Sequence, residues 1–455
     1  MTFSSLTFLF LFLPVSVAAF YLIPARFRTA RKIVLLALSV LFYAWGDASL
    51  LPVLLLSVCF NYFSGVQISA LKEKNNLSAA RFVMISAVAV NAGALAFFKY
   101  AGVAFPLGVS FYTFSAISYI LDIYMDRAEG DGNFLNAAFY MLFFPKVISG
   151  PIVEYRDMEE QIREMKAASR EEFCGGLYLF LIGLFKKVLI ADPLGVTFNR
   201  LQASSQVSAG TAWLTLIFYS LQLYFDFSGY SDMAIGLSRV FGFSFEKNFD
   251  YPYTSSSPTE FWRRWHISLG GWFRDYVYIP LGGNRCSKGR QLFNLSVVWV
   301  LTGLWHGNTL PFLFWGIYHG AFVILDKFCL KGFHQKAPHP LQVFLTTLMA
   351  FFGWSFFFNP TLADWGTFAG RLIGIGAAGA IDGTFLYNLR TNVLLLIIAF
   401  FGCTPWMKRL HEIFIYREKG SIAFWASAAV HVILLVFAIG NMVGSTYQTF
   451  LYFRF

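Results

Sequence analysis

The chain has 455 residues, of which 57% are hydrophobic and only 13% are charged. A soluble protein carries roughly twice that charged fraction, which excludes a soluble globular fold. The formal net charge of +10 comes from Lys and Arg gathered in short loops between apolar runs, as the cytoplasmic loops of membrane proteins require, so nucleic-acid binding is not indicated.

Apolar runs of membrane-spanning length recur from end to end, and they are continuous rather than alternating, which excludes a transmembrane β-barrel. We therefore predict an all-α, multi-pass membrane protein that forms a single domain over residues 1–455. Basic residues after the first run place the N-terminus outside the cytoplasm, and that run is predicted to be a retained span rather than a signal peptide. About twelve crossings are expected, at approximately 6–23, 32–46, 50–68, 82–98, 104–125, 175–191, 211–228, 291–305, 310–328, 341–358, 392–406 and 422–441.

Three apolar segments do not fit as crossings, because they would break the alternation of basic loops: 134–151, 258–280 and 366–381. The first two have cytoplasmic loops on both sides. We predict that they are re-entrant or interfacial, which is tolerated only where protein or a water-filled cavity satisfies the backbone. The charged stretch 154–172 is predicted to form one surface helix.

Two segments carry the candidate catalytic and binding residues, and the first of them is 257–285. Its start, Ser257-Pro-Thr-Glu260, is a capping box with Pro at the first helical position, and the helix is predicted to run to about Leu269. Spacing of i, i+4 places His266 on an aromatic face with Trp262. The arginines of the segment are expected either to hold anionic lipid headgroups or to bind the phosphates of a cytosolic donor: Arg263, Arg264, Arg274 and Arg285.

The second segment is the apolar run 310–328, which carries His319 near its middle, about 13 Å from its start at a rise of about 1.5 Å per residue. An ionisable side chain near the bilayer midplane is a functional-site hypothesis by default. Burial disfavours the charged imidazolium, so we expect a neutral ring that can accept a proton as a general base. The alternative is a core histidine hydrogen-bonded to a neighbouring helix.

For His266, a functional and a structural role stay open, whereas His306 is expected to be structural. The buried acids are expected to pair with an intramembrane partner such as Lys146, Lys186 or an arginine, rather than to act in catalysis: Asp122, Asp226 and Asp232. The five cysteines show no CxxC spacing, so no metal site or disulfide framework is predicted. Structural roles are also expected for the remaining histidines: His334, His339, His411 and His431.

Several phrases of the chain resemble the membrane-bound O-acyltransferase (MBOAT) family, and within it the bacterial subgroup typified by the membrane subunit of alginate O-acetylation. They occur in the family's order along nearly the whole chain. The phrases are PLGVSFYTFSAISYILDIY (106–124), FFPKVISGPI (143–152), YFDFSGYSDMAIG (224–236), FWRRWHISLGGWFRDYVYIPLGGNR (261–285), LTGLWHG (301–307), FWGIYHG (314–320) and YFRF (452–455).

The resemblance implies a ring of about 11–12 tilted transmembrane helices with re-entrant segments and a central tunnel that joins the two membrane faces at His319. His319 matches the family's essential histidine, and His266 matches a second histidine position upstream. The implied donor is a cytosolic acyl thioester, most simply acetyl-CoA, with no permanently bound cofactor. The implied location is the bacterial inner membrane, where a separate periplasmic acetyltransferase would complete O-acetylation of an exported polysaccharide such as alginate.

Three other functions stay open at this point. The same fold can transfer D-alanine to teichoic acid from a carrier protein, or serve peptidoglycan or cellulose O-acetylation. A proton-coupled transporter with a midplane histidine belongs to a different class, but such proteins often contain internal repeats, and the sequence shows none.

Overall fold

A computed structural model describes residues 1–130, 132–204, 207–409, 421–444 and 450–451. Every element within these ranges is a helix, and none of the described residues forms a strand, so the prediction of an all-α protein is confirmed. The contacts divide the chain into two compact units, while the single domain over 1–455 stays a prediction. The first unit comprises Met1–Gly183, Tyr230–Lys247 and Gly271–Val277, and the second comprises Leu184–Gly229, Asn248–Gly270 and Tyr278–Phe455.

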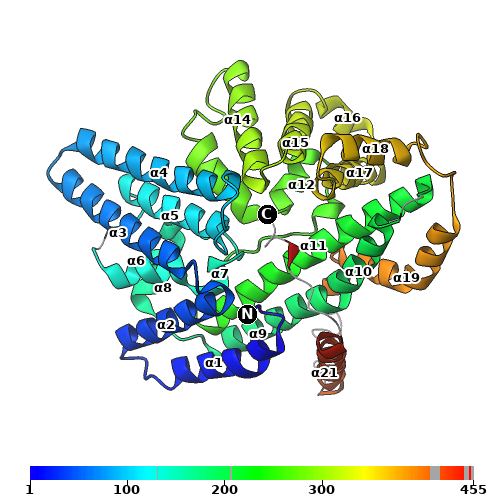
Figure 1. Cartoon of the computed structure of the whole chain (residues 1–455). Helices are drawn as coiled ribbons and strands as arrows, with labels where there is room; N and C mark the ends of the chain where they lie inside the picture. Colours follow the sequence, from blue (N-terminus) through cyan, green and yellow to red (C-terminus); the bar gives the residue numbers. More distant parts are fainter. Residues whose placement is uncertain (131, 205–206, 410–420, 445–449, 452–455) are drawn as a thin grey trace. The chain divides into compact units, whose positions relative to one another are not determined.

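The first unit contains the helices drawn in blue and cyan in Figure 1. Helices α3, α4 and α5 pack against one another within it. Helix α9 begins here, and α11 ends here. The elements are η1 (Phe8–Phe12), α1 (Leu13–Tyr21), α2 (Arg28–Asp47), α3 (Leu51–Glu73), α4 (Leu77–Tyr100), α5 (Val109–Tyr124), α6 (Phe134–Leu142), α7 (Phe144–Val147), α8 (Tyr155–Glu164) and α9 (Arg170–Phe185).

The second unit contains the helices around which the site is built. Helices α12, α14, α15 and α17 contact one another in the pairs α12–α15, α12–α17, α14–α15 and α15–α17 (Figure 1). Helix α13 begins in this unit and, with η4, continues in the first. The elements are η2 (Lys186–Ala191), α10 (Asp192–Gln202), α11 (Ala209–Val240), η3 (Pro252–Thr254), α12 (Pro258–Arg264), α13 (Ile267–Phe273), η4 (Arg274–Tyr278), α14 (Lys288–His306), α15 (Leu310–Phe328), α16 (Lys331–Lys336), α17 (His339–Phe358), α18 (Leu362–Leu372), α19 (Gly383–Gly402) and α21 (Ser421–Gly444).

Seven helices in the described part of the chain are long and apolar enough to cross a membrane, which agrees with a multi-pass protein. The other predicted crossings are also helical, but they are shorter or less apolar, and the total of about twelve stays a prediction. The seven are Arg28–Asp47, Leu51–Glu73, Leu77–Tyr100, Arg170–Gln202, His339–Phe358, Gly383–Gly402 and Trp425–Gly444.

The segments predicted not to cross are short or broken helices. Residues 134–151 form α6 and α7, which are separated at Phe143. Residues 154–172 do not form the single helix predicted from their charge. Helix α8 ends at Glu164, because Met165 adopts a left-handed φ of 45°. A capping box then starts α9: the Glu172 amide donates to Ser169 Oγ (3.2 Å), and the Ser169 amide donates to Glu172 Oε2 (2.7 Å).

Close packing of α14 against α15 depends on a small residue at their interface. A Cβ atom placed on Gly316 would lie 2.4 Å from the backbone oxygen of Trp299, closer than a real side-chain atom can approach. Glycine at this position therefore lets the two backbones come together, as small residues do between membrane helices. The approach brings Trp299 beside His319, one turn further along α15.

Candidate functional site

Helix α12 starts as its sequence predicts and is tied to α15. The Glu260 amide donates to Ser257 Oγ (3.2 Å), which is the expected cap. The Thr259 amide donates to Asp326 Oδ2 (2.9 Å), so a carboxylate from α15 satisfies a second amide of this first turn. His334 Nε2 lies 2.6 Å from the other oxygen of Asp326, in agreement with the structural role predicted for His334.

The prediction that this helix runs to Leu269 is wrong. It breaks after Arg264, and His266 adopts a left-handed φ of 47°. Asn248 compensates for the break, because its backbone oxygen accepts from the Ile267 amide (2.9 Å) and its Oδ1 accepts from the Ser268 amide (3.1 Å). The loop before α12 therefore caps α13, a long-range interaction that local sequence patterns do not contain.

The same asparagine sets the tautomer of His266, which is buried with 2% of its surface exposed. A backbone amide can only donate, so the contact from Ser268 N identifies the accepting atom of Asn248 as its oxygen. His266 Nδ1 lies 3.2 Å from that oxygen and must donate to it. The neutral ring therefore carries its proton on Nδ1 and its lone pair on Nε2.

His319 lies at the centre of an aromatic shell formed by α12, α14, α15 and α17. Its side chain has no exposed surface. Neither ring nitrogen has a hydrogen-bond partner among the residues that the structure describes. The surrounding rings, with the distances between ring centroids, are Trp262 (4.9 Å), Tyr318 (5.0 Å), Trp315 (5.2 Å), Trp354 (5.8 Å) and Trp299 (6.1 Å).

Packing alone therefore holds the His319 ring. A Cβ atom placed on Gly353 of α17 would lie 2.2 Å from Nε2, so the absence of a side chain at Gly353 makes room for the imidazole. The alternative predicted for His319, a core histidine bonded to a neighbouring helix, lacks its hydrogen bond in the described structure. The ring is fully enclosed, and the expected tunnel to it stays a prediction.

Aromatic contacts link the two candidate histidines within the second unit. The His266 ring lies 6.2 Å from Trp305, and Trp305 lies 4.7 Å from His306. His306 in turn lies 4.5 Å from Trp315, which contacts His319. His306 is itself buried, as expected of a structural histidine, with 3% of its surface exposed.

Three of the four predicted donor-binding arginines belong to the second unit, and their settings differ. Arg263 and Arg285 are exposed. Arg264 pairs with Glu260 (2.5 Å) and donates to Thr254 Oγ1 (3.1 Å). Arg264 also lines a cavity of about 270 Å³ together with two further cations, Lys408 and Arg409. The other lining residues are Asp250, Tyr251, Thr254 and Pro405.

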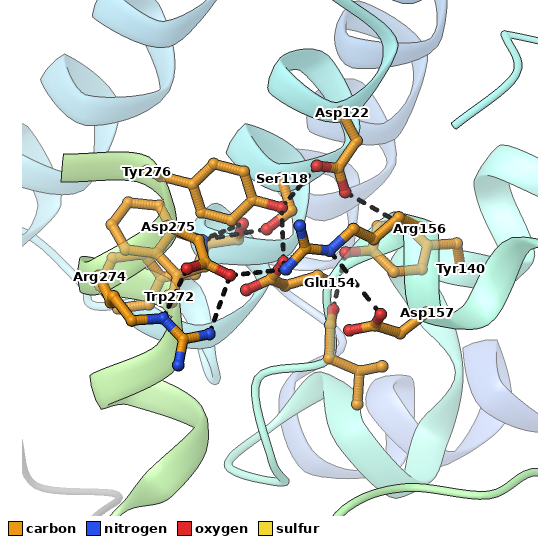
Figure 2. A network of polar contacts seen from close by, with 12 residues as sticks. Ser118, Asp122, Tyr140, Glu154, Arg156, Asp157, Trp272, Arg274, Asp275 and Tyr276 are labelled. Carbon is orange, nitrogen blue, oxygen red and sulfur yellow. Dashed lines mark hydrogen bonds and ion pairs between the residues drawn. The ribbon is translucent and has the colours of Figure 1, made fainter. Parts of the chain in front are cut away.

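The fourth, Arg274, belongs to an ion network of the first unit (Figure 2). Its guanidinium donates two hydrogen bonds to Asp275, from Nε to Oδ1 (2.6 Å) and from Nη2 to Oδ2 (3.1 Å). Arg156 reaches both Asp275 and Glu154, each at 2.6 Å. Burial opposes ionisation of Asp275, but the hydrogen bonds from Arg274 and Arg156 outweigh it and lower the pKa of this carboxyl. The network thus gives Arg274 a structural partner.

Figure 2 also shows two carboxylates that share one phenol. Tyr276 Oη lies 2.7 Å from Asp122 Oδ1 and 3.2 Å from Glu154 Oε2. A phenol has a single proton to donate, so the contacts are both favourable only when one carboxyl is protonated. Burial raises the pKa of Glu154 to about 7, against the counteracting charge of Arg156, which identifies Glu154 as the group that holds the extra proton.

Comparison with known proteins identifies the family of the chain. The model of the membrane-bound O-acyltransferase family matches residues 125–363, which include α12, α15 and Gly353. Over the full length of both chains, the protein is 34% identical to a probable alginate O-acetylase, AlgI, of Azotobacter vinelandii. It is 30% identical to a peptidoglycan O-acetyltransferase of Helicobacter pylori, over 100% of this chain and 97% of the relative. The chain belongs to the membrane-bound O-acyltransferase family.

A third relative is more distant. The teichoic acid D-alanyltransferase of Bacillus subtilis is 30% identical over 50% of this chain and 60% of its own length. Membership of the MBOAT family makes the protein an O-acyltransferase, as its phrases predicted. The assignment of catalytic and donor-binding roles to individual residues stays a prediction.

The structure of this MBOAT protein corrects one detail of the predicted ion pairs. Asp226 pairs with Lys187 (2.6 Å) rather than with Lys186, and Lys187 also holds Asp192 (2.7 Å). Asp122 is bonded to Tyr276 and to the Arg156 amide instead of to an intramembrane cation. His431 lies 2.7 Å from a carbonyl of its own helix, as a structural histidine would, while His411 and the phrase YFRF lie outside the described residues.

Gly353 provides the first test of the aromatic shell. In Gly353→Ala, the added methyl group would overlap His319 Nε2, so the ring has to move. A displacement of about 1 Å in a catalytic group can reduce turnover roughly 100-fold. Acyl transfer by the purified variant should fall by that order. Gly366→Ala, on α18 with open space around it, is the matched control and should keep full turnover. Wild-type turnover in Gly353→Ala would contradict this description of the shell.

Glu154 provides a test by pH. Because its pKa in the folded protein lies above the ordinary value of 4.5, ionisation of Glu154 destabilises the fold as the pH rises toward and past about 7. Thermal unfolding in detergent should show the Glu154→Gln variant gaining stability relative to wild type between about pH 5 and pH 8. Glu164→Gln, which removes a surface ion pair with Lys166, is the control and should track wild type. A pH-independent difference between Glu154→Gln and wild type would overturn the assignment.

Proposed function

We propose that this protein is a membrane O-acetyltransferase that takes an acetyl group from a cytosolic thioester, acetyl-CoA, and passes it outward for O-acetylation of an exported polysaccharide. His319 acts as the general base that removes the proton of the attacking hydroxyl. The observation that carries this proposal is a fully buried imidazole whose two nitrogens have no hydrogen-bond partner in the described structure. A buried polar group left in that state costs roughly 1–3 kcal/mol, which a purely structural histidine would not require.

The environment of His319 suits a base more than an ion pair. The side chains around it are aromatic and uncharged, so the neutral imidazole is favoured and its lone pair is available to a hydroxyl. Because the ring is enclosed, a substrate reaches it only when one of the surrounding rings moves. His266 plays a supporting part: its lone pair on Nε2 accepts a hydrogen bond from a substrate group other than the attacking hydroxyl and so orients the substrate.

The donor's phosphates bind at the cavity lined by Arg264, Lys408 and Arg409. Three cations and a single acid, Asp250, surround this space, and its volume of about 270 Å³ admits a phosphate-bearing group. Guanidinium groups bind phosphate oxygens in a two-pronged geometry, and the gathering of three cations around one space favours this cavity over Arg263 and Arg285. The same chemistry fits an anionic lipid headgroup, so the test below includes both.

The polymer and partner are proposed from the relatives. Those that match over the full chain are named for alginate or peptidoglycan O-acetylation, whereas the D-alanyltransferase matches over half of it. An exported polysaccharide such as alginate is therefore the favoured destination. The chain would act in the bacterial inner membrane with a periplasmic acetyltransferase that delivers the acetyl group to the polymer.

Transfer in proteoliposomes tests the proposal directly. With labelled acetyl-CoA on the cytosolic side, wild-type protein with its partner should transfer label to the polymer. His319→Ala should lose roughly 100-fold or more of the turnover, the contribution of a general base. His266→Ala should lose less, about tenfold. Full turnover in a folded His319→Ala variant would remove this residue from the mechanism, and wild-type turnover in His266→Ala would leave His266 structural.

Charge at the Arg264 cavity gives a separate test. Lys408→Gln combined with Arg409→Gln should raise the KM for acetyl-CoA several-fold with little change in kcat, because the lost contacts bind the donor away from the reacting atoms. Charge reversal at Arg264 should act in the same direction, and reversal at the exposed Arg263 should act less. If the KM is unchanged and only binding to vesicles of anionic lipid falls, the cavity holds a headgroup instead.

A further inference from the structure

Several indole N–H groups in the described part of the chain donate a hydrogen bond. This is the usual state of a buried tryptophan. Trp365 Nε1 donates to Ser355 Oγ (2.9 Å), and Trp213 Nε1 donates to the Leu372 carbonyl (2.9 Å). Trp354 Nε1 donates to Tyr253 Oη (3.1 Å). Each of these donors stabilises the packing of its helix.

Two of the tryptophans that contact His319 depart from that pattern. The Nε1 atoms of Trp262 and Trp315 are shielded from solvent, and neither has a hydrogen-bond partner among the residues that the structure describes. Both rings contact His319, with centroids 4.9 Å and 5.2 Å away. They also contact each other at 5.6 Å. The rings of Trp262, Trp315 and His319 therefore all contact one another, and the nitrogen atoms of all three lack a hydrogen-bond partner among the described residues.

Acyl transfer requires such donors. When a hydroxyl attacks a thioester, negative charge develops on the carbonyl oxygen, and N–H groups aimed at that oxygen lower the barrier. The histidine that might supply one is not suited to it, because neutral His266 uses its only N–H to bond Asn248 Oδ1. A neutral His319 that accepts the proton of the hydroxyl has the opposite task. Among the described residues, the indoles of Trp262 and Trp315 combine a ring contact with the base and an N–H group without a partner.

We propose that the indole N–H groups of Trp262 and Trp315 bind the carbonyl oxygen of the transferred acyl group and the oxyanion formed from it. This inference rests on the acyl transfer proposed above. The oxygen of the acceptor hydroxyl forms a bond to the carbonyl carbon while its proton passes to His319. The carbonyl oxygen takes the negative charge and is held by the two donors. The C–S bond then breaks as the carbonyl re-forms, and the sulfur takes the proton back from His319.

The burial of these donors fits that role. In a shell shielded from solvent, an N–H group interacts more strongly with developing charge than it would in bulk water, and it needs no reorganisation during the reaction. An indole N–H group also supplies a hydrogen-bond donor without a positive charge. A cation beside His319 would disfavour protonation of the imidazole and so weaken it as a base. An Arg or Lys at the same place would repel the imidazolium that forms when His319 takes the proton of the hydroxyl.

The test replaces single N–H groups while preserving ring shape. Trp262 and Trp315 are exchanged, one at a time, for β-(3-benzothienyl)alanine, in which sulfur stands where the indole nitrogen was. Each exchange should lower kcat for acetyl transfer by roughly 100-fold, the effect of one oxyanion donor, with little change in the KM for acetyl-CoA. The same exchange at Trp365 removes a donor that bonds Ser355 and should leave kcat unchanged.

The outcomes separate this inference from the proposed function. If His319→Ala is inactive but both benzothienyl variants turn over at the wild-type rate, the donors are wrongly assigned and the acetyl transfer stands. If His319→Ala is fully active, the proposed mechanism fails whatever the indoles do. A kcat loss that is equal in the Trp365 exchange would show a general packing effect and would overturn the inference. Trp262→Phe and Trp315→Phe provide a second route, with folding checked by gel filtration.

Discussion

The second unit encloses an imidazole, that of His319, for which the described residues provide no hydrogen-bond partner. Each unsatisfied ring nitrogen costs roughly 1–3 kcal/mol, so the surrounding contacts have to stabilise the fold enough to hold it. The shell does this with large aromatic side chains, which bury much apolar surface at little loss of conformational freedom. Two glycines make this packing possible. Gly316 lets α14 approach α15, and Gly353 makes room for the imidazole ring. Any side chain at either position would separate the parts that make the shell.

Two polar residues bring the broken segment 258–270 to that shell. Asp326 holds the first turn of α12, and Asn248 holds the first turn of α13. Both supply oxygen atoms to amides that a helix start leaves without partners, so a break in the middle of the segment has little cost in hydrogen bonds. Because the break falls between Trp262 and His266, the tryptophan is directed to His319 while the histidine is bonded to Asn248. Continuous helix over the same residues would have kept both on one face.

Local and periodic features of this fold were predictable, whereas long-range contacts were not. The all-α class, the start of α12 at Ser257 and the burial of His319 follow from apolar run length, a capping pattern and position within an apolar run. The end of α12 was misplaced because Gly270-Gly271 is the stronger local stop signal, while the actual break is stabilised by Asn248 from another part of the chain. Asp226 pairs with an intramembrane cation as expected, but with Lys187 rather than the adjacent Lys186 given as an example, since sequence does not reveal the rotation of a helix. Trp262 was placed on an aromatic face, but its contact with His319 depends on helix packing that one sequence cannot express.

The ion network of the first unit and the aromatic shell of the second bury their polar groups in different ways. In the first unit, Arg156 connects Glu154 to Asp275, and the phenol of Tyr276 connects Glu154 to Asp122 (Figure 2). A network whose members satisfy one another is rigid and has little tendency to bind anything else. In the second unit, His319, Trp262 and Trp315 retain hydrogen-bonding capacity that the described protein atoms do not use. A hydrogen bond that such a group forms with a substrate atom is stronger than the same bond in water, because the shell around the group has a low dielectric constant. Hydrogen-bonding groups left unused by the described protein atoms are what the proposed acyl transfer requires, and folding around them carries a cost in free energy.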